Sequence, residues 1–380
     1  MKRELKTDTF LPEKVMLMKM TLRWYGSKLD NITLKQIRQI PGVTGVISGL
    51  YDIPAGEVWP LDQIRALKEE IEKEGLALEG IESVNVHEDI KLGTPEAEKY
   101  IENYKQTLRN LAEAGIKLVC YNFMPVFDWL RTDLAKVLPD GSNTMSYDED
   151  IIRKINPASM FDEMTSQSNG FVLSGWEPER IMEIQRLLEL YSDVDEEKVW
   201  KNLEIFLKEV IPVAEKYDIK MAIHPDDPPW SVFGLPRLIT SKENLERFIN
   251  LVDSPYNGLT VCTGSLGANP ENNIPEIIRY FGAKGRVHFG HVRNIKIYEP
   301  GKFDEVSHKT EDGSLDMFEI MKAFYDIGFD GPIRPDHGRM IWGEKGRPGY
   351  GLYDRALGAV YLNGLWEAIE RMDRTWHEKH

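Results

Sequence analysis

Four phrases decide the fold of this chain: Ile223-His224-Pro225, Val261-Cys262-Thr263-Gly264, Phe289-Gly290-His291-Val292-Arg293 and Arg334-Pro335-Asp336-His337-Gly338. Each phrase places a histidine, cysteine or aspartate where an apolar run stops and a loop begins. Nitrogen and sulfur donors with a carboxylate at the ends of successive strands are typical of a metal site. In a parallel β-barrel such strand ends share one mouth. The phrases therefore predict a barrel enzyme with a metal at that mouth.

The rest of the chain alternates short apolar runs with longer amphipathic stretches, the pattern of βα units. Eight strands are predicted, at residues 20–25, 43–48, 77–83, 117–123, 220–224, 259–263, 286–291 and 331–336. Helices are predicted at residues 61–74, 95–114, 199–217, 242–251, 314–327 and 352–372. Gly75, Gly115 and Gly328 mark turns from a helix into the next strand. Eight such units predict an α/β fold, a (β/α)8 TIM barrel.

The length of 380 residues suits one such barrel with insertions. No low-complexity linker divides the chain, so we predict a single barrel domain over residues 18–380 and an N-terminal extension over residues 1–17. The fourth and fifth strands are unusually far apart. Residues 127–176 between them are rich in Asp, Ser, Asn and Pro. An insertion after a strand lies at the active-site mouth, so we expect a lid there.

Composition excludes several classes of partner. The net charge of -15 and the pI near 5.1 argue against nucleic acid and acidic membrane surfaces, because both are polyanions. The two cysteines, Cys120 and Cys262, cannot build a disulfide framework. The sequence shows neither a membrane-length apolar run nor the apolar core of a secretion signal. We therefore expect a cytoplasmic protein that binds neither nucleic acid nor membrane.

Alternation along the strands indicates which side chains point inward. His224 shares a face with Ala222, which directs it toward the barrel axis. His288 and His291 have opposite phases, and we predict that His291 is the inner one. Asp336 and His337 are adjacent, so a pleated strand cannot direct both inward. We therefore expect His337 just beyond the strand end, free to act beside the metal.

Each of these residues has a simpler interpretation when it is taken alone. His224 could be a hydrogen-bonded core histidine, and Cys262 a small buried hydrophobe. Asp336 could cap the next helix, and His337 could be an ordinary loop residue. Their occurrence at four consecutive strand ends favours the metal site. Cys120 has no comparable partner and is predicted to be core.

Further polar residues end other predicted strands at the same mouth. Arg23 lies in the first strand, Glu82 ends the third, Asn122 the fourth and Arg293 the seventh. Arginine binds a carboxylate through two parallel hydrogen bonds, so these residues are predicted to bind an acidic substrate. Salt bridges to the many acidic residues of the chain are the alternative.

Several longer phrases closely resemble bacterial mannonate dehydratases of the xylose-isomerase-like barrel type, as distinct from the enolase-superfamily type. They include Met20-Thr21-Leu22-Arg23-Trp24-Tyr25-Gly26, Gly56-Glu57-Val58-Trp59-Pro60, Tyr121-Asn122-Phe123-Met124-Pro125, His224-Pro225-Asp226-Asp227-Pro228-Pro229 and Arg334-Pro335-Asp336-His337-Gly338-Arg339. The resemblance spans residues 18–372. Residues 1–17 depart from the family pattern.

The resemblance implies dehydration of D-mannonate to 2-keto-3-deoxy-D-gluconate in hexuronate (glucuronate) catabolism, with Mn²⁺ or Fe²⁺ as cofactor. We also expect a homodimer. By resemblance, the metal ligands are His224, Cys262, His291 and Asp336, and the catalytic pair is His337 and Tyr350. Tyr350 enters from the resemblance alone, and loop packing is its simpler interpretation. The ligands by themselves would have suggested Zn²⁺.

The expected chemistry follows from the weak acidity of the C2 proton of an aldonate. A divalent cation would stabilise the enediolate, a base would remove the C2 proton, and an acid would assist departure of the C3 hydroxyl. His337 and Tyr350 are predicted to share the last two roles, in an unassigned order. A sugar isomerase, an endonuclease and an inactive metal-dependent binder of sugar acids are the alternatives. Acidity disfavours the endonuclease, and an isomerase would be expected to use more carboxylate ligands.

Overall fold

The computed structural model describes residues 18–155, 166–168, 170–171 and 178–379. Eight parallel strands close into a barrel in the order β1-β12-β9-β8-β7-β4-β3-β2. They are β1 (Lys19–Arg23), β2 (Val43–Ser48), β3 (Ala77–Glu82), β4 (Leu118–Tyr121), β7 (Lys220–Ile223), β8 (Asn257–Cys262), β9 (Val287–His291) and β12 (Pro332–Arg334). The predicted eight-stranded barrel is confirmed. The predicted extension at residues 1–17 and part of the predicted insertion at 127–176 lie outside the described residues.

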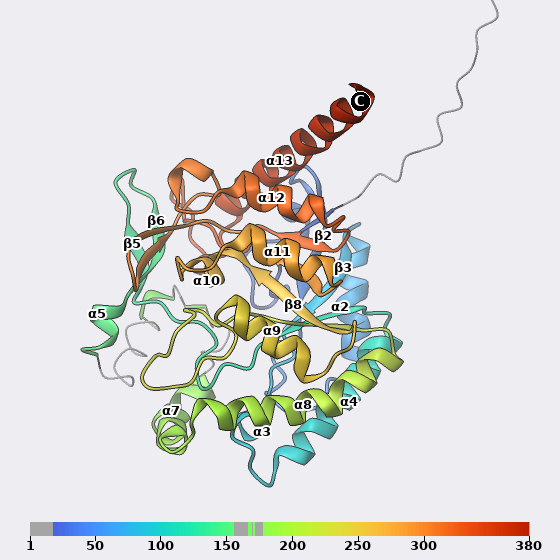
Figure 1. Ribbon diagram of the computed structural model, residues 1–380, viewed down its shortest axis with the longest axis vertical. Helices are drawn as coiled ribbons and strands as arrows, with labels where there is room; N and C mark the ends of the chain where they lie inside the picture. The colour runs from blue at the N-terminus through green and yellow to red at the C-terminus, as the bar shows by residue number, and fades with distance from the viewer. Residues whose placement is uncertain (1–17, 156–165, 169, 172–177, 380) are drawn as a thin grey trace, which may run out of the picture.

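Helices surround the barrel (Figure 1). Those that follow barrel strands include α1 (Leu34–Arg38), α2 (Leu61–Lys73), α3 (Glu88–Leu92), α4 (Ala97–Glu113), α9 (Lys242–Leu251), α10 (Thr263–Gly267), α11 (Ile274–Ala283), α12 (Met317–Asp326) and α13 (Leu352–Lys379). The segment between β4 and β7 adds α5 (Glu149–Ile152), α7 (Pro178–Tyr191) and α8 (Glu196–Lys216). A short 3₁₀ helix spans Thr310–Asp312. None of the helices among these residues is long and apolar enough to cross a bilayer.

Local sequence explains where many of these helices begin and end. The Asp195 side chain accepts a hydrogen bond from the Lys198 amide and caps α8, a common helix start. Gly75, Gly115 and Gly328 follow helices with φ of 75°, 80° and 62°, a left-handed conformation that favours glycine. The three predicted helix-to-strand turns are therefore present.

A second sheet of four strands lies beside the barrel, with the order β10-β11-β6-β5 and antiparallel pairing. It contains β5 (Asp133–Val137) and β6 (Asn143–Asp148) from the insertion after β4, and β10 (Ile295–Glu299) and β11 (Lys302–Glu305) from the hairpin after β9. Figure 1 shows the β5–β6 pair at the side of the molecule. This sheet was not predicted, and it joins two segments that both leave the carboxyl ends of barrel strands.

Candidate active site

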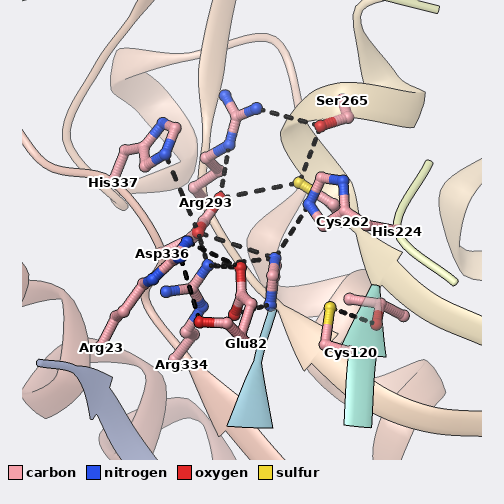
Figure 2. Close-up of polar contacts among 12 residues, drawn as sticks. Arg23, Glu82, Cys120, His224, Cys262, Ser265, Arg293, Arg334, Asp336 and His337 are labelled. Atoms are coloured by element: carbon pink, nitrogen blue, oxygen red, sulfur yellow. Dashed lines mark hydrogen bonds and ion pairs between the residues drawn. The ribbon is translucent and has the colours of Figure 1, made fainter. Parts of the chain in front are cut away.

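The four predicted metal ligands converge at the carboxyl ends of neighbouring strands, and Figure 2 labels three of them, His224, Cys262 and Asp336. His224 directly follows β7, Cys262 ends β8, His291 ends β9, and Asp336 lies two residues beyond β12. One donor atom from each of His224, Cys262 and His291 lies within 4.8 Å of the other two. Carboxylate oxygens of Asp336 lie 3.7 Å from the Cys262 sulfur and 3.6 Å from His291 Nδ1. The structure thus brings the four side chains together, while their role as ligands stays a prediction.

The surrounding charges favour the ionised forms of Cys262 and Asp336. Burial alone would raise the pKa of the Cys262 thiol, but the Arg293 guanidinium and contacts from His224 bring it well below its ordinary value. The thiolate is the form of cysteine that binds metals. Burial also opposes ionisation of Asp336, yet His337 and neighbouring arginines hold its pKa well below its usual range. Two anionic donors therefore face two imidazoles.

The backbone at Asp336 differs from its predicted form. The alternation argument placed Asp336 on the last strand, but β12 ends at Arg334, so Asp336 and His337 both lie beyond it. Asp336 has φ of 57°, a left-handed conformation that aspartate tolerates better than most residues. The turn lets both side chains line one cavity, which a pleated strand would forbid. The predicted strand at 331–336 is therefore too long.

A second set of donor atoms comes from Glu82, Cys120 and His291. The Glu82 carboxylate is bound by Arg23 at 3.0 Å and by Arg334 at 2.9 Å (Figure 2). Burial raises the pKa of the Cys120 thiol well above its ordinary value, so the thiol keeps its proton. A thiol and a carboxylate already paired with two arginines suit a cation poorly. The prediction that Cys120 is core is confirmed by its complete burial.

His337 and Tyr350 face each other at the cavity wall. Nε2 of His337 lies 2.9 Å from the Tyr350 hydroxyl, and both side chains are buried. Burial raises the pKa of Tyr350, so its hydroxyl is protonated at neutral pH. On the other side of the ring, His337 Nδ1 lies 2.9 Å from each carboxylate oxygen of Glu305. Glu305 ends β11, in a hairpin without any motif, and no sequence signal singled it out.

The predicted substrate-binding residues occupy two different positions. Arg23, Glu82 and Asn122 line the cavity. Arg293 is buried behind Asp336, where its Nε donates to the Asp336 carboxylate at 2.9 Å. Its Nη2 contacts Asp227 at 2.7 Å. The guanidinium of Arg293 is thus engaged within the protein, and Arg293 is absent from the cavity wall that the described residues form.

Sequence reasoning did not single out Arg334 as a substrate ligand, although it precedes Asp336 in one of the four phrases. Arg334 lines the cavity, and its Nη2 contacts Glu82 and Asp336 at 2.9 and 2.6 Å. Within the described part of the chain, its Nε and Nη1 have no hydrogen-bond partner. A buried guanidinium with two open donors can bind an anion. The position of Arg334, two residues before the predicted ligand Asp336 on the inward face of the strand, was the sequence signal that could have identified it.

The described part of the insertion contributes to the cavity wall. Asp128 and Trp129, which follow β4, line the cavity together with Asp227. Arg131 is completely buried and contacts the two Asp227 carboxylate oxygens at 2.8 and 2.9 Å. Its Nη2 also donates to Glu305 at 2.7 Å. These contacts tie the insertion to the loops after β7 and β9, while the predicted lid stays a prediction.

Comparison with known proteins gives concordant results. The family described as D-mannonate dehydratase (UxuA) matches residues 18–376. A mannonate dehydratase from Thermotoga petrophila is 64% identical over 359 residues, covering 94% of this chain and 100% of that protein. The crystal structure of mannonate dehydratase from Streptococcus suis serotype 2 superposes with a TM-score of 0.86 at 45% identity, covering 94% of this chain and 96% of that one.

A more distant likeness bears on the fold alone. A xylose isomerase-like TIM barrel protein from Mycobacterium smegmatis superposes with a TM-score of 0.52 at 13% identity. The match covers 93% of this chain and 97% of the other. The predicted xylose-isomerase-like barrel is therefore confirmed.

Proposed function

Because this chain belongs to the D-mannonate dehydratase family, we propose that its cavity removes water from D-mannonate and forms 2-keto-3-deoxy-D-gluconate. The enzyme is accordingly a hydro-lyase. The observation that carries this function is the buried pair of His337 and Tyr350, in contact at 2.9 Å beside the four converging side chains that are predicted to bind metal. Dehydration of an aldonate needs both a proton acceptor and a proton donor, and this pair supplies two such groups.

A divalent cation fits the donors that converge at the strand ends. His224 Nε2 and His291 Nδ1 lie only 3.1 Å apart, with the Cys262 thiolate and the Asp336 carboxylate beside them. We propose that these four residues hold Mn²⁺ or Fe²⁺, as the family resemblance implies. When bound, the cation would supply Lewis-acid stabilisation for the negative charge that develops on the substrate carboxylate.

The open donors of Arg334 support binding of an acidic substrate. Arg334 lines the cavity, and its Nε and Nη1 have no hydrogen-bond partner among the described residues, so they are free to donate to a carboxylate or hydroxyl. Arg23 and Asn122 line the same cavity, and Glu82 holds both arginines in place. Arg293 was predicted to bind substrate, but its contacts favour a role in fixing Asp336.

The two proton transfers are assigned to His337 and Tyr350. One of the two side chains takes the proton from C2, and the other gives a proton to the departing C3 hydroxyl. Both side chains are buried, with His337 6% and Tyr350 4% exposed, so bulk water has little access to either. This burial keeps the transferred protons within the site.

The test is an assay of the purified full chain on a panel of hexonates, with and without added Mn²⁺ or Fe²⁺. We expect a 2-keto-3-deoxy product from D-mannonate that depends on metal. Tight binding of D-mannonate without turnover would instead support an inactive sugar-acid binder. In a parallel assay with aldoses, conversion of an aldose to a ketose without loss of water would instead support an isomerase.

Three further proposals concern the cellular setting. We propose that the enzyme acts in glucuronate catabolism and in the cytoplasm, where a reducing environment keeps the Cys262 thiolate available. We also propose a homodimer. Tyr353, Leu357 and Val360 lie on one face of α13 and are 43, 47 and 44% exposed, an apolar surface that a second copy could cover. Sedimentation equilibrium would decide between monomer and dimer.

A further inference from the structure

We propose that Glu305 is a positioning residue that keeps a proton on Nδ1 of His337 and leaves Nε2 as the atom that exchanges a proton with Tyr350. The proposal rests on the proposed roles of His337 and Tyr350 in dehydration. It goes further by assigning each ring nitrogen of His337 and by giving the hairpin after β9 a part in the chemistry.

The geometry around His337 Nδ1 is the first support. Both carboxylate oxygens of Glu305 lie 2.9 Å from Nδ1, and Glu305 is only 2% exposed. Burial opposes ionisation of Glu305, but His337, Arg293 and Arg131 lower its pKa to about 2. An ionised carboxylate can only accept hydrogen bonds. Nδ1 must therefore carry hydrogen to form this contact.

A fixed hydrogen on Nδ1 determines the state of the other ring nitrogen. In a neutral imidazole one nitrogen is a donor and the other an acceptor. Nε2 of neutral His337 is then the acceptor, and the Tyr350 hydroxyl donates to it across 2.9 Å. The exchangeable proton therefore lies between Nε2 and the Tyr350 oxygen.

Glu305 is itself held from two directions. Arg131 Nη2 and Arg293 Nη1 donate to its Oε1 at 2.7 and 3.2 Å. Arg131 comes from the insertion after β4, and β11 pairs with β6 of the same insertion. Since both arginines bind Oε1, the Oε2 atom has His337 as its hydrogen-bond partner among the described side chains. The insertion thus orients the carboxylate toward the imidazole.

A simpler account is that Glu305 only neutralises the two buried arginines. Substitution Glu305→Gln keeps the shape of the side chain but removes its charge, so the tautomer of His337, read from its ¹⁵N spectrum, separates the two accounts. The amide oxygen would remain with Arg131 and Arg293, so the amide nitrogen would take the position of Oε2. It would donate to His337 Nδ1 and move the ring hydrogen to Nε2. The variant therefore favours the opposite tautomer and preserves the contacts with both arginines.

The matched control is Asp304→Asn. Asp304 is the preceding residue on β11, is 1% exposed, and contacts Lys136 and the Tyr298 hydroxyl at 2.8 Å each. It therefore tests the loss of a buried charge on the same strand without any contact to His337. For Glu305→Gln we expect kcat to fall by about 10²-fold or more, with KM and metal content unchanged. Asp304→Asn should keep the parent kcat.

Parent-like kcat in the Glu305→Gln variant would overturn the proposal, as would a loss of kcat that only follows loss of metal. A second measurement does not depend on the folding of any Glu305 variant. The ¹⁵N spectrum of the histidine-labelled, zinc-loaded full chain should show His337 protonated at Nδ1, with its signals assigned by their absence in His337→Asn. A bare Nδ1 would refute the proposal. Absence of dehydratase activity in the parent would instead refute the proposed function.

Discussion

Replacement of His337 by asparagine should separate catalysis from metal binding. The His337 ring lies outside the cluster of metal donors, since its Nε2 is 4.0 Å from the nearer Asp336 oxygen and is directed to Tyr350 at 2.9 Å. We therefore expect His337→Asn to keep its metal and still bind D-mannonate. The loss should fall on turnover, because the proton relay with Tyr350 exists only through the imidazole.

The size of the loss can be estimated from the two contacts of the ring. A positioned acid or base contributes about 10² to 10⁴ in rate, which corresponds to ~3 to 5 kcal/mol of transition-state stabilisation. The cost to folding should be smaller, about 1 to 3 kcal/mol. Glu305 remains paired with Arg131 and Arg293 after the substitution, so no buried charge is left unpaired.

The assay combines elemental analysis, calorimetric titration with D-mannonate and steady-state turnover. Asp336→Asn is the comparison variant, because it removes a charged donor and leaves Arg334 and Arg293 beside a neutral amide. It should lose metal as well as activity. If the His337 variant loses its metal, or turns over at nearly the parent rate, then the division between metal binding by Asp336 and proton transfer by His337 is wrong. Tyr350 then becomes the first alternative as the residue that transfers the proton.

Three other substitutions test separate parts of the structure. Cys262→Ser replaces a thiolate with a weak neutral donor, so metal content should fall sharply, and full occupancy would remove Cys262 from the site. Arg131→Met breaks buried ion pairs and should lower the free energy of unfolding by about 3 kcal/mol. The control Arg153→Met, at a side chain 72% exposed, should leave the melting temperature unchanged. Equal melting temperatures of the two variants would refute this prediction. Burial lowers the pKa of His288 to about 4. The unfolded chain binds this proton below about pH 6.5, so His288 contributes stability above that pH and loses it as the pH falls toward 4, by ~3 kcal/mol. Urea unfolding at neutral and acid pH should show a smaller drop in His288→Gln than in the parent, and an equal drop would contradict the assignment.

The sequence by itself determined the barrel and most of the residues at its mouth. Strands in a parallel barrel are buried on both sides, so their sequences are short apolar runs. A polar residue at the carboxyl end of such a run is therefore expected at the active-site mouth of the barrel. His224, Cys262 and His291 follow this rule directly. Tyr350 lies in a loop without periodicity and was found by family resemblance alone.

Only the tertiary structure decided how these residues are supported. Glu305 reaches His337 because β11 pairs with β6, and Arg131 contacts Glu305 across a sequence separation of 174 residues. Short strands outside the barrel leave no strong alternation of apolar and polar residues in the sequence. Pairing between distant segments depends instead on burial and charge compensation in the folded chain. The left-handed turn at Asp336 has the same origin, since the surrounding arginines hold the carboxylate in a place that local preference does not specify.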